Sequence, residues 1–390
     1  MDKRRMKKLM APAMLTTMLM THQSHAQMDP NGWQVGVGAV IDTAVTSRAL
    51  ALGLRDQGLQ LGHSDLAVGG PLGQHLQAQW SASLATHEGQ LKAHIEEAWI
   101  QTRQLPAGLN ARVGRFAAQV GSLNPQHPHT DDFVERPLLY RSFLGGHWTD
   151  DGIRLNLTLP TTLYWVVGAE AFRGRQLVPQ APHSPTGAGA FTLSTRTGGD
   201  LNRSSSWHIG LSYLHNRRAA AFHQEVVHEG EELDGDHDHE THDHNHGARF
   251  SGRHLSLLDM TWKWAPDGNN RQQQLRVSLE GAQVRGAQGS RQAALRHSAW
   301  GLAAVWRWHP HWEIGARRDR LRAAIAHEDH VDLGRLREQA LMLAWKPSHR
   351  QTVRVQWTRQ SDAASLESPA RRSLALQYIL AFGAHGAHAY

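Results

Sequence analysis

LQAQWSASL (Leu76–Leu84) alternates apolar and polar residues without interruption. Successive side chains of an extended chain point to opposite sides, so the leucines, alanines and Trp80 share one face while the glutamines and serines share the other. A period of two is typical of a β-strand that lies between an apolar and a polar environment. The stretch therefore predicts a sheet with one apolar and one polar surface.

The same alternation returns along most of the chain, for example in Trp207–Tyr213, Trp300–Trp308 and Leu374–Phe382. We count sixteen candidate strands, an even number, as is typical of bacterial membrane barrels. They lie at residues 33–46, 62–68, 74–85, 92–103, 110–118, 152–159, 161–173, 187–197, 207–214, 254–264, 271–282, 298–308, 312–322, 337–346, 351–360 and 372–390.

The apolar faces favour a membrane barrel over a soluble β-sandwich. Many of the 14 tryptophans lie near strand ends, where barrels carry aromatic girdles. An arginine on the lipid face at mid-membrane costs about 2–4 kcal/mol, so Arg154, Arg276, Arg307 and Arg354, all on the polar parity, are expected in the lumen. We predict an all-β fold, a transmembrane antiparallel β-barrel of about 16 strands without a plug domain, over residues 27–390.

Residues 1–26 have the form of a secretory signal peptide: basic residues, the apolar run Leu9–Met20 and the small-residue ending Ser24-His25-Ala26. The predicted destination is the outer membrane. The partners expected there are its lipid and the barrel-assembly machinery, which would read a closing strand with Tyr378, Phe382 and Tyr390 on one parity. The arginines are scattered along the sequence, and nucleic acid is not an expected partner.

Connections between the predicted strands alternate between short and mostly longer ones. Bacterial barrels have short periplasmic turns and longer external loops, so this pattern places residues 215–253 outside the cell. The predicted short turns are Gly69–Gly73, Gln104–Gly108, Pro160, Gly198–Ser206, Pro266–Asn270, His309–His311 and Pro347–Arg350.

The external loop contains DGDHDHETHDHNHG (Asp234–Gly247), in which histidines alternate with carboxylates. Imidazole and carboxylate together suit Zn²⁺, Ni²⁺ or Cu²⁺. The alternative is a solvated polar insert with no ligand. The candidate metal ligands are His228, Asp236, His237, Asp238, His239, His242, Asp243, His244 and His246.

The other long connection, residues 119–151, is the third external loop by this count. In porins of sixteen strands this loop commonly folds into the lumen, where mixed charges would set ion selectivity. The alternative is an external loop with ordinary surface charges. The candidate pore-lining residues are His127, His129, Asp131, Asp132, Glu135, Arg136, Arg141 and His147.

Three segments carry a family resemblance: Gly114–Leu138, Phe143–Leu155 and Leu376–Tyr390. They resemble porins of the phosphate-selective type and, more closely, zinc-associated outer-membrane proteins of Gram-negative bacteria with a histidine-rich loop. The resemblance implies a barrel and a passage function. Phosphate specificity does not transfer, because the chain has only six lysines. Some relatives are TonB-dependent receptors, but the 364 residues after position 26 have no room for a plug and a barrel of ~22 strands.

The leading functional hypothesis is an outer-membrane channel that captures or passes divalent metal, Zn²⁺ first and Ni²⁺ or Cu²⁺ next, through the external histidine-rich loop. No further cofactor is required. One alternative is a porin for small anionic solutes with an incidental loop; another is a closed surface barrel that sequesters metal. An enzyme is not expected, since G-x-S-x-G and H-E-x-x-H are absent from the sequence. The sequence leaves open whether three barrels form a homotrimer.

Overall fold

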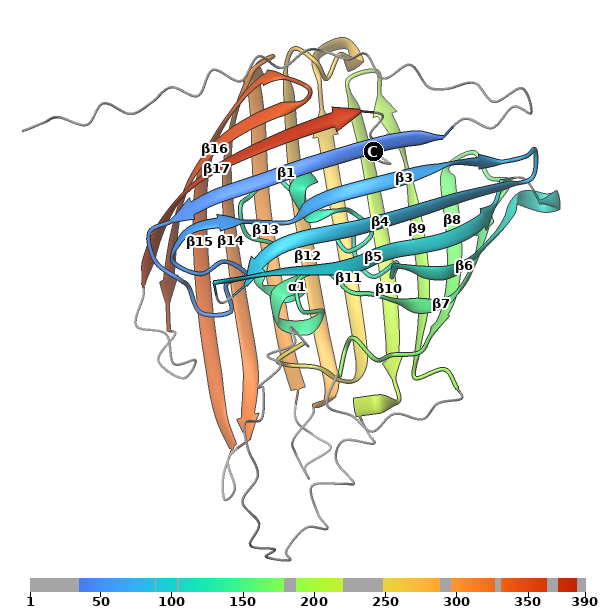
Figure 1. The fold of residues 1–390 in the computed structure, drawn as a ribbon, viewed down its shortest axis with the longest axis horizontal. Coiled ribbons are helices and arrows are strands. Elements are labelled where there is room, and N and C mark those ends of the chain that lie inside the picture. Colours follow the sequence, from blue (N-terminus) through green and yellow to red (C-terminus); the bar gives the residue numbers. More distant parts are fainter. Residues whose placement is uncertain are drawn as a thin grey trace, which may run out of the picture.

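The computed structural model describes residues 35–87, 89–103, 105–178, 187–219, 248–287, 296–326, 331–362 and 371–383. They form one antiparallel sheet in which β1 pairs with β17, so the sheet closes into a barrel (Figure 1). The strands are β1 (Gly36–Thr46), β2 (Gly58–Leu61), β3 (Ser64–Leu72), β4 (Leu76–His87), β5 (Gln90–Thr102), β6 (Leu109–Ala117), β7 (Thr149–Thr158), β8 (Tyr164–Phe172), β9 (Ala190–Asn202), β10 (Ser205–Asn216), β11 (Gly252–Trp264), β12 (Gln274–Ala287), β13 (Arg296–His309), β14 (Trp312–Ala326), β15 (Val331–Ser348), β16 (Gln351–Ser361) and β17 (Arg372–Gly383).

The short strand β2 and the strand β3 are two parts of one wall strand. Both pair with β1, which matches Thr43 to Leu61 and Val40 to Asp65. Between these pairs β1 advances by three residues and its partner by four, so one extra residue interrupts the ladder, as in a β-bulge. With β2 and β3 counted together, the barrel has sixteen wall strands, which confirms the prediction.

Two predicted turns are wrong in position. Gly69 lies inside β3, opposite Gln79 of β4, and the turn follows at residues 73–75. A Cβ atom at Gly69 would come within 3.0 Å of the carbonyl oxygen of Ala78, so glycine here permits a close approach of two strands rather than a turn. Likewise, β9 continues through Gly198 and Gly199 to Asn202. The segments 1–26 and 384–390 and the histidine-rich stretch lie outside the described residues.

The barrel has two different rims (Figure 1). One rim, here called the short-turn rim, carries the connections 73–75, 103–108, 159–163, 203–204, 265–273, 310–311 and 349–350. The opposite, long-loop rim carries 47–57, 118–148, 173–189 and 217–251, together with shorter connections. This alternation confirms the predicted pattern of short and mostly longer connections.

Large apolar side chains cover the outside of the barrel, as the alternation predicts. Near the short-turn rim four tryptophans form a row on neighbouring strands, with ring centroids of successive members 6.3 Å apart: Trp306, Trp308, Trp312 and Trp345. Such a row marks the level of a membrane interface. The closing strand also presents Tyr378 and Phe382 outward.

The arginines divide between the two faces. Arg154 and Arg354 are buried inside the barrel as predicted, and the half-buried Arg276 and Arg307 pair with Asp132 and Glu313. The prediction that the arginines are scattered is wrong on the outer surface. Arginines of β14 to β17 gather there on adjacent strands, because cross-strand pairing joins residues that are distant in the sequence.

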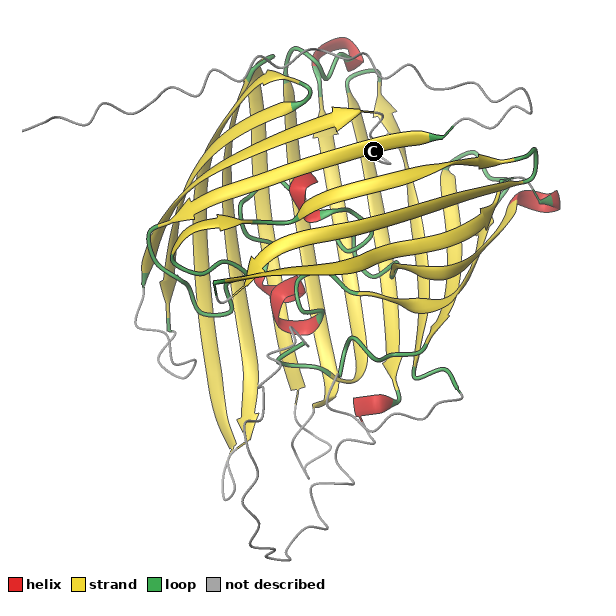
Figure 2. Cartoon of the chain, in the orientation of Figure 1, coloured by secondary structure: helices red, strands yellow, loops and turns green. Residues whose placement is uncertain are grey.

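The third loop, residues 118–148, folds into the barrel interior (Figure 2). Its helix α1 (Leu138–Phe143) has all six residues buried and packs against β12, β13 and β14. Buried side chains of α1 join Phe116, Trp148 and Phe172 in an apolar core inside the barrel. An internal core was not predicted, because the lumen was expected to be polar. None of the described helices is long and apolar enough to span a membrane.

Buried ion pairs fix α1 to the wall. Arg141 donates from Nη2 to Oε1 of Glu338 at 2.5 Å, and Arg317 donates to the same oxygen at 2.7 Å. All three side chains are buried. A buried charge without a partner is costly. Glu338 therefore joins an arginine of the loop to one of the wall, and Asp319 supplies a second carboxylate to Arg317.

Because only one face of β12 contacts lipid, an arginine should cost more stability at an outward position than at the inward position next to it. Leu279 faces outward between Met260 and Leu302, whereas Ser278 faces inward. Leu279→Arg should lower the free energy of unfolding by about 2–4 kcal/mol in lipid, and the control Ser278→Arg by less. Denaturant titration in vesicles measures both. Equal losses would contradict the assignment of the outer face.

Removal of the shared carboxylate should loosen the third loop. Glu338→Ala leaves Arg141 and Arg317 without their common partner and should cost about 3–5 kcal/mol of unfolding free energy. The matched control is Asp362→Asn, at the exposed pair with Arg337, where a loss below about 1 kcal/mol is expected. If the two variants lose the same stability, the buried network does not anchor the loop.

Candidate metal centre

The eight predicted pore-lining residues all belong to the internal loop, and most of them are buried. Arg136 binds Asp131 in an ion pair of 2.7 Å and also donates to the backbone oxygens of Gly146 and Gln126. Glu135 accepts a hydrogen bond from the backbone N–H of Leu54. Burial raises the pKa of Glu135 above its ordinary value. The charges of the loop are thus paired partly within the loop and partly with the wall, and the lining of an open passage stays a prediction.

Three histidines of the loop turn toward the barrel wall. His127 Nδ1 lies 3.2 Å from Oδ2 of Asp65 and 3.3 Å from Oε2 of Glu96. His129 Nδ1 lies 2.8 Å from Asp65, and His147 Nδ1 lies 2.7 Å from Glu96. The loop therefore brings three imidazoles onto two carboxylates of the wall.

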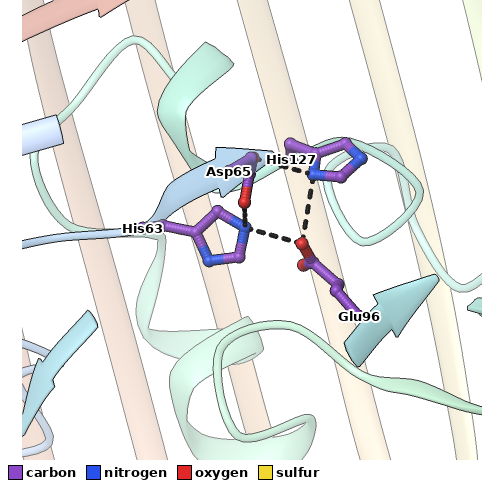
Figure 3. A group of neighbouring side chains, drawn as sticks. All are labelled: His63, Asp65, Glu96 and His127. Carbon is purple, nitrogen blue, oxygen red and sulfur yellow. Dashed lines mark hydrogen bonds and ion pairs between the residues drawn. The ribbon is translucent and has the colours of Figure 1, made fainter. Parts of the chain in front are cut away.

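A fourth imidazole comes from the wall itself. Nε2 of His63 lies 3.0 Å from Oδ1 of Asp65 and 2.9 Å from Oε2 of Glu96 (Figure 3). His63, Asp65, Glu96 and His127 each direct one ligand atom into the same space, with all four atoms within 4.8 Å of one another. We call these four residues the lumenal cluster.

Two irregularities of the ladder position the wall members of the lumenal cluster. His63 and Asp65 lie at the junction of β2 and β3. The second irregularity lies in β5. Its pairing with β4 joins Ser81 to Glu97 and Ala82 to Ile95, so Glu96 is the extra residue of a bulge in β5. Both Glu96 and Glu97 consequently face the interior. Bulges commonly redirect a side chain at a functional site.

The contacts in the lumenal cluster suit a cation better than a set of hydrogen bonds. Only His63 and Glu96 are aligned as a hydrogen bond. Within the described residues, both oxygens of Asp65 and Nδ1 of His127 are buried without a hydrogen-bond partner. A tetrahedral zinc ion with bonds of about 2.0–2.1 Å would space its ligand atoms roughly 3.3 Å apart. The shortest separations in the cluster are close to that spacing.

The charge of the site also favours a cation. Asp65 and Glu96 are almost fully buried, whereas His63 and His127 keep 16% and 18% of their side-chain surface exposed. Burial alone would lower the pKa of His127, but Glu96 and Asp65 outweigh it and raise the pKa well above its ordinary value. The carboxylates thus favour positive charge here, and a metal ion bound at the cluster would take the place of the His127 proton. Burial lowers the pKa of His147 to about 4.

Sequence reasoning named His127, His129 and His147 as pore-lining candidates and not as metal ligands, and it missed His63, Asp65 and Glu96. A signal for the missing residues exists. The outward apolar positions are odd-numbered up to Ile95 and even-numbered from Ala98 onward, and a similar shift separates Leu61 from Leu66. A change of phase in the alternation marks each irregularity.

The predicted metal ligands of the external loop, His228 and the residues from Asp236 to His246, lie outside the described residues. Their role stays a prediction. The described ends of that connection are β10 and β11 at the long-loop rim.

The comparisons with known proteins address the fold. No family model matches the chain. An uncharacterised protein of Aquifex aeolicus (strain VF5) is 41% identical over 80 residues, which cover 20% of this chain and 17% of that protein. The chain therefore spans less than a fifth of that relative.

Solved structures match over most of the barrel. OprB of Pseudomonas putida is 12% identical with a TM-score of 0.55, over 90% of this chain and 94% of that one. DcaP, an outer-membrane channel of Acinetobacter baumannii, is 10% identical with a TM-score of 0.53, over 90% and 97%. An anion-selective porin of Comamonas acidovorans is 11% identical with a TM-score of 0.52, over 90% and 100%. The fold of this chain is that of the outer-membrane porins.

Proposed function

We propose that this protein is a porin-type channel of the outer membrane that handles divalent transition-metal ions, with Zn²⁺ as the first candidate. The observation that carries the proposal is the lumenal cluster, in which His63, Asp65 and Glu96 of the wall meet His127 of the third loop. The metal is a cargo in this proposal.

The donor set fits such an ion chemically. Two imidazoles with two carboxylates form a nitrogen and oxygen ligand set suited to Zn²⁺ and its neighbours, whereas Mg²⁺ and Ca²⁺ prefer oxygen alone. Two carboxylate charges would balance one divalent cation, which lowers the cost of holding the charge away from bulk water. Neighbouring His129 and His147 contact the same carboxylates and would orient them.

The external histidine-rich stretch, Asp234–Gly247, would serve as the capture step. Its imidazoles and carboxylates would give several weak sites, which raise the local ion concentration without trapping the ion. The long-loop rim would face the outside of the cell. In this scheme an ion passes from the external loop toward the lumenal cluster.

The interior argues against the alternative of a pore for anionic solutes. Arg136, Arg141, Arg154 and Arg317 are each held in ion pairs with carboxylates of the interior. Arg317 also pairs with Asp319, so four carboxylates face these four arginines and offset their positive charge. A closed metal-sequestering barrel is the other candidate, favoured by the apolar core around α1, and conductance separates it from a channel.

Location and assembly belong to the same proposal. The outward apolar surface and the porin fold support insertion into the outer membrane through the barrel-assembly machinery. One similar structure, OmpT of Vibrio cholerae, is described as a trimer form. Association of this chain into a homotrimer is a proposal that cross-linking in native membranes would test.

Zinc binding should depend on two separate sets of histidines. Titration calorimetry of the purified barrel should show several weak sites that disappear when Asp234–Gly247 is deleted, and one further site that disappears in His63→Gln/His127→Gln. The matched control His309→Gln/His311→Gln removes two adjacent exposed histidines at the short-turn rim and should change nothing.

The weak sites should also follow imidazole chemistry. Affinity should fall as the pH drops through about 6, because protonated imidazole cannot bind metal, and Cu²⁺ should bind more tightly than Ni²⁺ or Zn²⁺. Equal zinc binding by the wild type and by the protein without both histidine sets would refute metal handling.

Zinc should reduce the potassium conductance of the barrel in planar bilayers, because an ion held at the lumenal cluster adds positive charge and bulk to the passage. The reduction should be lost in His63→Gln/His127→Gln and kept in the His309/His311 control. A wild-type barrel without conductance, but with zinc binding, would favour the closed barrel instead.

A further inference from the structure

A cluster of arginines lies on the outer surface of the barrel, on the strands next to its closing seam. We call it the outer arginine patch and define it by six residues that face away from the lumen. They are Arg318, Arg320 and Arg322 of β14, Arg335 and Arg337 of β15, and Arg359 of β16.

Strand pairing brings these residues together. Arg320 lies directly opposite Arg337, and Arg322 lies directly opposite Arg335. Residues so paired have Cα atoms about 4.5–5.5 Å apart, and like charges in this position repel each other. On the far side of β16, Arg359 lies opposite Arg372 of β17. The patch thus lies on three neighbouring strands (Figure 1), and Arg372 continues the positive charge onto a fourth.

Among the residues that the structure describes, acidic neighbours do not balance this charge. Among the side chains that the structure describes, Asp362 forms an ion pair with Arg337 over 3.0 Å, and both partners are about half exposed. Exposed pairs of this kind are weak. In the described part of this surface one carboxylate faces six guanidinium groups, which leaves it positive, so an anionic partner from outside would stabilise it.

The height of the patch on the barrel indicates which partner. Along β14 the outward residues change from Trp312 and Ile314 near the short-turn rim to arginine from position 318 onward. A tilted strand rises about 2.5 Å per residue along the barrel axis, so Arg320 and Arg322 lie roughly 20–25 Å above Trp312. The apolar band of such barrels is about 25 Å tall. Arg320 and Arg322, with Arg337 and Arg335 opposite them, therefore lie at the level of lipid headgroups. Arg318 lies lower, about 15 Å above Trp312, and its long stem lets the guanidinium group reach the same level.

We propose that the outer arginine patch binds the phosphate groups of anionic lipids in the leaflet that surrounds the long-loop rim. Guanidinium groups bind phosphate oxygens in bidentate pairs, and the arginine stems can lie along the acyl chains while their charged ends reach the headgroups. The patch continues directly into the apolar belt, so a bound lipid would place its chains against Ile314 and Leu341. A second copy of the chain does not suit the patch, because its own patch would bring the same positive charge.

The test compares lipid binding by two quadruple variants of the full chain. Arg320→Gln/Arg322→Gln/Arg335→Gln/Arg337→Gln removes four charges from the patch. The control Arg103→Gln/Arg203→Gln/Arg271→Gln/Arg350→Gln removes four exposed charges at the short-turn rim and changes the net charge equally. Native mass spectrometry from mixed micelles of phosphatidylglycerol and phosphatidylcholine measures the lipid retained by each protein.

The wild type and the control should retain phosphatidylglycerol in preference to phosphatidylcholine, and the preference should weaken with added salt. The patch variant should lose at least about tenfold of its apparent affinity for phosphatidylglycerol, since each arginine near a charged membrane surface contributes severalfold. Equal retention by patch variant and control would overturn the proposal. Saturation of the patch by inorganic phosphate alone, at the concentration of the lipid, would also overturn the proposal, because the site would then not require a lipid.

Discussion

Closure of the sheet between β1 and β17 is the constraint on which the rest of the structure depends. Backbone N–H and C=O groups cannot remain unpaired in lipid, and a closed ring is the arrangement of strands that pairs them all. Closure also fixes an inside and an outside for every residue, which makes the alternation of side chains strict. Departures from the alternation can therefore be recognised, and the wall residues of the lumenal cluster lie at two of them.

The interior faces a second constraint, since charges removed from bulk water need partners. The third loop meets it by carrying Arg136 and Arg141 into the barrel together with acidic partners on the loop and the wall. The same loop supplies an apolar helix, so the lumen holds a small hydrophobic core that resembles the core of a soluble domain. The lumenal cluster lies at the edge of this packed loop, which holds the backbone around His127 in place.

The sequence alone predicts the class of fold well and the candidate site only in part. Strand number and rim alternation follow from periodicity and connection lengths, which are local properties. The inward fold of the third loop, expected over residues 119–151 and found over 118–148, was expected only from the behaviour of this loop in porins of sixteen strands. The pairing of His127 with Asp65 and Glu96 is not local, because it depends on which wall strand the loop meets. The outer arginine patch was not predicted for the same reason, because Arg322 and Arg335 are neighbours only through the register of two strands.

The bulge at Glu96 has a consequence for how this protein can change in evolution. Ile95 and Ala98 both face outward, and Glu96 and Glu97 between them both face the interior. A deletion of Glu96 would restore a regular ladder between β4 and β5, with Glu97 as the single inward residue between two outward ones, so the lipid face of the wall would not change. The reverse event, insertion of one residue, adds an inward carboxylate without turning any outward side chain away from lipid. A bulge of this kind can therefore be gained or lost in one step, and with it a ligand of the lumenal cluster.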